Sequence, residues 1–141
     1  MRFVRLHPEI ALTHPDFDEV RDFTSLVIRV RDEAGVSFNI EFRRDLFYSK
    51  TDECYFFTRD VATELSQSEN SVHWLYEVQE SPLLQDFKAR NPHINPNWDL
   101  RHYLVVVDNE VMDVIAAEQP SISGRTDSVR GWIRPGEERS E

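Results

Sequence analysis

The chain of 141 residues is 40% hydrophobic and 11% aromatic, a composition that excludes full disorder and fits one globular domain with its own core. Its 26 acidic and 16 basic residues give a net charge of −10, which repels nucleic-acid phosphates and anionic membranes and attracts a basic surface. The same charge also keeps a small protein soluble, so it favours a basic partner without requiring one.

Several classes of protein are disfavoured by what the sequence lacks. The longest apolar run, YLVVV at 103–107, is far below the ~20 residues of a membrane-spanning helix. The N-terminus lacks the apolar core of a signal peptide, so we expect a soluble, cytoplasmic protein. Cys54 is the single cysteine and predicts a buried thiol instead of a disulfide. No Gly-rich phosphate loop and no G-x-S-x-G motif occurs, so we expect no cofactor.

The N-terminal part of the chain predicts loops and one hairpin. Two His-Pro-acid triplets in residues 7–22 predict loops, and PDFDEVRD in the same range predicts a short helix. Residues 25–43 alternate apolar and polar side chains on either side of DEAG, which predicts a β-hairpin whose turn is closed by a left-handed glycine. The predicted register pairs Val30 with Phe38, Ile28 with Ile40 and Leu26 with Phe42. The opposite face, which should meet water or a partner, carries Arg29, Arg31, Asn39, Glu41 and Arg43.

The middle of the chain is richer in aromatic residues. LFYS and CYFFT flank the turn candidate KTDE at 50–53, which predicts a second hairpin buried on both faces. Thr58 can cap a short helix over 59–66. The segment VHWLYEV at 72–78 fits either a strand or a helix.

The clearest helix follows Ser81. Ser81 stands at the cap position, Pro82 at the first helical position, and the Asn-Pro pair at 91–92 ends the helix. Asp86 and Arg90 are four residues apart and can form an ion pair. Helical spacing gives the inner face Leu83, Leu84 and Phe87.

Residues 101–117 predict a further hairpin with an acidic turn. YLVVV is apolar at every position, as in an interior strand. A three-residue turn over 108–110 pairs Val105 with Asp113 and places Asp113 on the face opposite an inward row. That pairing also matches Val106 with Met112, Leu104 with Val114 and Tyr103 with Ile115, and the inward row is Met112, Val114 and Ala116.

Asp113 has three interpretations on such a strand. A charge there can block edge-to-edge aggregation and have no other role. It can bind an arginine from a partner or from the C-terminal segment, since apolar surroundings strengthen a bidentate pair. It can also be a general base with a raised pKa, which requires a cleft and a second polar group.

The segment NPHINPNWDLRH at 91–102 is the one compact set of metal-binding residue types. His93, Asp99 and His102 surround Trp98, and two histidines with a carboxylate can bind zinc or iron. Their spacing matches no metal motif, and two Asn-Pro pairs already explain the stretch as an extended turn. We therefore expect no metal site and keep these three residues as its only candidates.

Together these patterns predict an α+β fold: an antiparallel sheet of about five or six strands with one or two helices packed on one face. We expect a single domain over residues 1–118. The Ser-, Gly-, Arg- and Glu-rich residues 119–141 predict an irregular or partly disordered tail. Trp132 in this tail can dock on the domain or on a partner.

The sequence favours a non-enzymatic module that binds a protein, for example a small acidic neutraliser of a basic protein, of the immunity type. The expected partner-binding residues are Asp108, Glu110, Asp113 and Trp132. The alternative is an enzyme or small-ligand binder, with or without a metal ion, that has a pocket between sheet and helices, because a site assembled from distant residues leaves no local motif.

Overall fold

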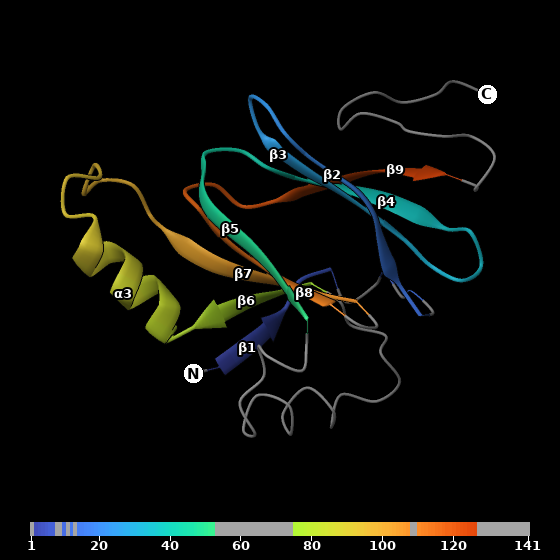
Figure 1. The fold of residues 1–141 in the computed structure, drawn as a ribbon, viewed down its shortest axis with the longest axis horizontal. Helices are drawn as coiled ribbons and strands as arrows, with labels where there is room; N and C mark the ends of the chain where they lie inside the picture. Colours follow the sequence, from blue (N-terminus) through green and yellow to red (C-terminus); the bar gives the residue numbers. More distant parts are fainter. Residues whose placement is uncertain are drawn as a thin grey trace.

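Two antiparallel sheets make up most of the computed structural model, which describes residues 2–7, 10, 12, 14–52, 75–107 and 110–126 (Figure 1). For residues 51, 52 and 124–126 it describes the backbone alone. The first sheet, sheet A, has five strands in the order β1-β6-β7-β8-β5. Their bounds are Arg2–Arg5 for β1, Leu75–Gln79 for β6, Arg101–Val106 for β7, Glu110–Ala116 for β8 and Asp45–Asp52 for β5.

The second sheet, sheet B, has four strands in the order β2-β3-β4-β9. A single helix, α3 (Pro82–Arg90), is described beside them. The expected single sheet is therefore replaced by two antiparallel sheets, and the protein is β-rich with a minor helical part. The strands of sheet B are β2 Asp16–Asp22, β3 Leu26–Arg31, β4 Ser37–Phe42 and β9 Ser121–Thr126.

The core lies where the apolar faces of the two sheets meet. Alternation along each strand sends every second side chain to this interface. An aromatic contact joins the sheets, because Phe42 of β4 packs on Tyr103 of β7 with ring centroids 5.5 Å apart. The fully buried members from both sheets are Leu26, Ile28, Val30, Ile40, Phe42, Leu75, Tyr103, Val105, Met112, Val114 and Ala116.

The β3–β4 hairpin has the predicted register. Val30 lies opposite Phe38, and the next two predicted pairs follow in order. Gly35 has a φ of 86°, the left-handed conformation that glycine adopts without steric cost. The Asp32 carboxylate accepts hydrogen bonds from the Ala34 and Val36 amides at 3.0 and 2.8 Å, which fixes the turn.

The β7–β8 hairpin differs from its predicted register by one residue. Leu104, not Val105, lies opposite Asp113, and the Val107 amide donates to the Glu110 carbonyl at 3.0 Å. The loop is therefore shorter than the expected three-residue turn. The expected inward row of β8 is confirmed, since Met112, Val114 and Ala116 belong to the core cluster. YLVVV is apolar on both faces, so its own pattern could not fix which side chains point inward.

Three other segments differ from their sequence prediction. PDFDEVRD contributes strand β2, not a helix, and residues 50–52 belong to β5, not to a turn. Strand β5 is only partly covered, with Tyr48 40% exposed, so burial on both faces was wrong. Sheet B also includes residues beyond 118, because its strand β9 lies in the predicted tail. Cys54 and the predicted helix over 59–66 lie outside the described residues.

Helix α3 lies against the face of sheet A that points away from sheet B. Phe87 of the helix packs on Phe47 of β5 with ring centroids 6.0 Å apart. The predicted pair is present, with Arg90 Nε 3.0 Å from an Asp86 carboxylate oxygen. No residue of the helix is fully buried, so packing alone holds it weakly. In the part of the chain described here, no helix has the length and apolar character to cross a membrane.

Candidate functional site

A buried chain of three polar side chains links helix α3 to the middle of sheet A. His102 Nε2 lies 2.6 Å from Asp113 Oδ1, and His102 Nδ1 lies 2.7 Å from Ser81 Oγ. The exposed fractions of Ser81, His102 and Asp113 are 3%, 4% and 2%. We call these three residues the polar relay.

The strand register brings His102 and Asp113 together. Asp113 lies opposite Leu104, and His102 lies opposite Ile115. His102 and Asp113 are therefore diagonal neighbours on one face of an antiparallel pair, a separation that long side chains can bridge. Aliphatic side chains surround the pair on this face, with Leu104 and Ile115 both fully buried.

Ser81 enters the relay because it caps α3. Its backbone is extended, and its Oγ accepts a hydrogen bond from the Leu84 amide at 3.1 Å. The Ser81 carbonyl accepts from the Gln85 amide, which closes the first helical turn. The side-chain oxygen thus satisfies a free amide at the helix start while its other side faces His102. The cap that the sequence predicted is confirmed, and it has a second contact.

Hydrogen-bond donors and acceptors match throughout the relay. An ionised Asp113 only accepts, so His102 Nε2 donates to it. His102 Nδ1 then accepts from the Ser81 hydroxyl when the ring is neutral, or donates to Ser81 Oγ when it is cationic. Burial raises the pKa of Asp113, while the hydrogen bond and charge of His102 act in the opposite direction.

The geometry of the polar relay suits stabilisation of the fold better than nucleophilic catalysis. A serine nucleophile needs an Oγ that a substrate can reach, with an activating base beside it. Ser81 Oγ is buried and already accepts the Leu84 amide. Because the relay joins a helix without fully buried residues to the central strands, its clearest effect is to anchor α3.

The metal candidates are not brought together. His93 is exposed, and Asp99 pairs with Arg101 at 2.9 Å. His102 instead belongs to the buried relay. Within the ranges that the structure describes, no group of three or more His, Cys, Asp or Glu side chains is placed to hold a metal ion.

The predicted partner-binding residues have different surroundings. Glu110 forms an ion pair with Lys50 at 3.1 Å on the half-exposed end of the β7–β8 hairpin. Asp113 lies inside, on His102, so its assignment to a partner surface stays a prediction that needs a rearrangement of the sheet. Asp108 and Trp132 lie outside the described residues.

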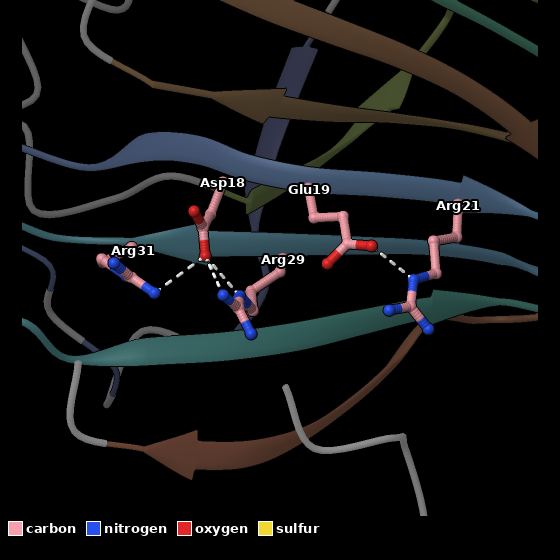
Figure 2. A network of polar contacts seen from close by, with 5 residues as sticks. All are labelled: Asp18, Glu19, Arg21, Arg29 and Arg31. Atoms are coloured by element: carbon pink, nitrogen blue, oxygen red, sulfur yellow. Dashed lines mark hydrogen bonds and ion pairs between the residues drawn. The ribbon is translucent and has the colours of Figure 1, made fainter. Parts of the chain in front are cut away.

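A second polar cluster lies on the face of sheet B that points away from the core. Strand β2 bulges at Asp18, because pairing with β3 shifts register between Phe17 and Glu19. The Asp18 carboxylate contacts two guanidinium groups of β3, those of Arg29 and Arg31 (Figure 2). The Arg31 contact measures 3.0 Å. The predicted polar face of the β3–β4 hairpin is thus organised by a carboxylate from a third strand.

Strand β2 is also the edge of sheet B and carries most of its acids. Among the described strands, β2 pairs with β3 alone. Its sequence DFDEVRD has four acidic residues and one basic residue. At its end Phe23 is 86% exposed, and the adjoining Asp22 carboxylate adds to burial in raising the pKa of Asp45.

Sequence reasoning named the members of the polar relay but not their contacts. Ser81 was read as a cap, His102 as a metal candidate and Asp113 as a surface or catalytic acid. The contacts depend on where α3 docks and on the β7–β8 register, which the sequence predicted with an error of one residue.

A comparison with known protein families, curated proteins and solved structures gives no match.

Proposed function

We propose that this protein is a non-enzymatic module that binds a basic protein, as a small acidic neutraliser of the immunity type does. The observation that carries the proposal is the acidic edge strand β2, which is followed directly by the exposed ring of Phe23. Proteins bind one another mainly through a few aromatic or arginine anchors, with surrounding charges that steer the encounter. Strand β2 combines both features.

The charge of β2 supports a basic partner. Asp16 and Asp22 are exposed at the two ends of the strand, and the whole chain carries a net charge of −10. Exposed charges act over about 8 Å at physiological salt, so the local acids matter more than distant ones. A lysine- or arginine-rich surface would meet this edge with complementary potential.

The Phe23 side chain supports a direct contact. An aromatic ring exposed to 86% gains no burial within the described fold, while a pocket on a partner would remove it from water. A single exposed apolar residue is common on protein surfaces. The Phe23 ring lies beside the acidic edge strand, and this position favours a role as a binding anchor.

The buried relay supports the non-enzymatic side of the proposal. The Ser-His-Asp set holds its serine as a helix cap and leaves all three side chains at most 4% exposed. The candidates for a metal-dependent site are separated in space, as described above. Among the described residues, the candidates named for a pocket therefore do not form one site.

The test compares two variants with the same net charge. One carries Asp16→Lys and Asp22→Lys on β2, and the other carries Asp86→Lys and Asp99→Lys on exposed acids elsewhere. Proteins captured from lysate at low salt are identified and purified, and their affinity for each variant is measured by calorimetry. We expect the β2 variant to lose about tenfold or more in affinity and the control to lose less. Phe23→Ala should weaken binding without changing the thermal midpoint.

Two outcomes would overturn this surface. Equal losses in both variants would mean that net charge alone attracts the partner. Full affinity in the β2 variant would exclude the edge strand, and the hairpin tip then becomes the face to test with Asp108→Arg and Glu110→Arg. An intact complex after both pairs of reversals would remove the acidic interface altogether.

A further inference from the structure

Two exposed aromatic side chains lie at edge strands of different sheets. Within the described part of the chain, Phe23 and Tyr48 are the large hydrophobic side chains that stand exposed, at 86% and 40%. Phe23 directly follows β2, an edge strand of sheet B, and Tyr48 belongs to β5, an edge strand of sheet A. Exposed aromatic rings are the side chains that protein partners most often cover.

A pair of carboxyl groups joins these two edges. The side chain of Asp45, at the start of β5, is hydrogen-bonded to the side chain of Asp22, the last residue of β2, and to the Leu26 amide. Phe23 is the residue after Asp22, and Tyr48 comes three residues after Asp45, about 10 Å along a strand. The two rings therefore flank the carboxyl pair where the edges of the sheets meet. We call Asp22, Phe23, Asp45 and Tyr48 the sheet corner.

The Tyr48 ring lies on the face that sheet A turns toward sheet B. Tyr48 is opposite Val114, and Asp45 is opposite Ala116, and directly opposite residues of an antiparallel pair share a face. Val114 and Ala116 are fully buried in the core between the sheets, whereas Tyr48 is 40% exposed. Sheet B therefore covers this face only in part, and a partner can reach the ring from the β5 edge.

The sheet corner concentrates negative charge. Burial, together with the charge and hydrogen bond of Asp22, raises the pKa of Asp45, as is expected for two carboxyl groups held close together. Arg44, the residue before Asp45, pairs instead with Glu118 at 3.2 Å. A cation supplied by a partner would relieve the repulsion between the two carboxylates.

Another part of the chain shows how a cation binds between a ring and a carboxylate. The Arg44 guanidinium lies 5.4 Å from the centre of the Trp98 ring and at the same time pairs with Glu118. A planar guanidinium can stack on a ring while its fork of donors binds carboxylates, whereas the lysine ammonium is a compact and strongly hydrated charge. The sheet corner offers the same combination to an arginine from outside.

We infer that the partner-binding surface continues from Phe23 across Asp22 and Asp45 to Tyr48, and that it binds an arginine side chain of the partner. The guanidinium pairs with the carboxylates and stacks on the rings. This inference rests on the proposed function, because it names the residue type through which the basic partner is recognised and extends the contact from sheet B to sheet A.

The test is a nuclear magnetic resonance titration of the full-length protein, labelled with ¹⁵N, with hexa-arginine and hexa-lysine peptides as probes. The two peptides carry the same number of basic side chains, so a difference between them reports on the guanidinium group and not on charge. We expect hexa-arginine to shift the amide signals of Phe23, Asp45 and Tyr48. It should bind about two- to fivefold more tightly than hexa-lysine.

Variants of the sheet corner separate the ring from the carboxylate. Tyr48→Leu should remove most of the preference for arginine, while Tyr48→Phe keeps the ring and should retain the preference. Asp45→Asn should weaken hexa-arginine binding more than Glu33→Gln does. Glu33 is an exposed acid in the β3–β4 turn, at the other end of that hairpin, and its variant has the same net charge as Asp45→Asn.

Three results would overturn the inference. Equal affinity for the two peptides would mean that charge alone attracts them. Signal shifts confined to residues 16–20 would restrict the contact to β2 and leave the proposed function standing. An unchanged preference for arginine in Tyr48→Leu would exclude the second ring. The proposed function fails separately, when the variant with Asp16→Lys and Asp22→Lys keeps full affinity for the captured protein.

Discussion

The two buried polar clusters differ in how far the described fold completes them. In sheet A, Ser81, His102 and Asp113 satisfy one another along a single line. In sheet B, Asn39 is just as buried but has no partner among the described residues. A closed polar network ties elements of one domain together, whereas a buried polar group without a partner lowers stability.

The comparison also separates a buried carboxylate from a partly exposed one. Asp113 meets an imidazole in an aliphatic setting, and burial raises its pKa. Asp18 meets two guanidinium groups on a face that is partly open to water. The first arrangement fixes a helix to a sheet, while the second ties the edge strand β2 to its neighbour.

The largest effect is expected when the closed cluster loses its central member. His102→Ala leaves the Asp113 carboxylate buried without a partner, so we expect the free energy of unfolding at neutral pH to fall by about 3–5 kcal/mol. Urea unfolding followed by circular dichroism measures this change. Combining His102→Leu with Asp113→Leu removes both polar groups and should recover much of the loss. A loss below about 1 kcal/mol in His102→Ala would mean that the relay is not the anchor of this face.

A smaller effect is expected at the helix end of the relay. Ser81→Ala removes the cap for the Leu84 amide and the partner of His102 Nδ1, which should cost about 1–2 kcal/mol. Hydrogen exchange should show faster opening of α3 with little change in β3 and β4. Ser81→Thr keeps the hydroxyl and serves as the control. If α3 opened no faster in Ser81→Ala, the helix would be held by other contacts.

The smallest effect is a change in pH dependence. The folded-state pKa of Asp113 lies above its ordinary value of 3.8, so the native state binds this proton more tightly than the unfolded chain does. Its favourable contribution is complete below that value and is lost as pH rises through the raised pKa. The stability of the wild type relative to Asp113→Asn should therefore fall as pH increases from about 4. The pKa of Asp45 is also raised, but Asp45 is present in both proteins, so its contribution to the pH dependence cancels in the difference. A flat difference, or one that rises with pH, would contradict the raised pKa.

The hairpins show what local sequence can predict. The β3–β4 register followed from alternation and from Gly35, because a one-residue slip would pair apolar with polar side chains. On β7 the run YLVVV gave no such contrast, so the β7–β8 register could slip by one. The number of sheets depends on pairings such as β5 with β8 and β4 with β9, which join distant segments. Alternation within a strand carries no information about those pairings.

The β2 strand shows how a local irregularity misleads. Phe17 and Val20 both pack against the core, and their spacing of three positions is typical of a helix. The bulge at Asp18 produces this spacing in a strand, because it inserts an extra residue between them. The polar relay could not be predicted either, since it needs three separate segments in their final positions.

The order of strands in sheet A has a consequence for how the chain folds. Its outer strands β1 and β5 pair with β6 and β8, which come much later in the sequence. Each of these pairings closes a long loop, and the entropy cost of closing that loop comes before the favourable contacts form. The β3–β4 and β7–β8 hairpins can form early from local contacts, so the completion of sheet A is expected to limit the folding rate. Folding on the millisecond-to-second timescale of proteins rich in non-local strand pairings would follow.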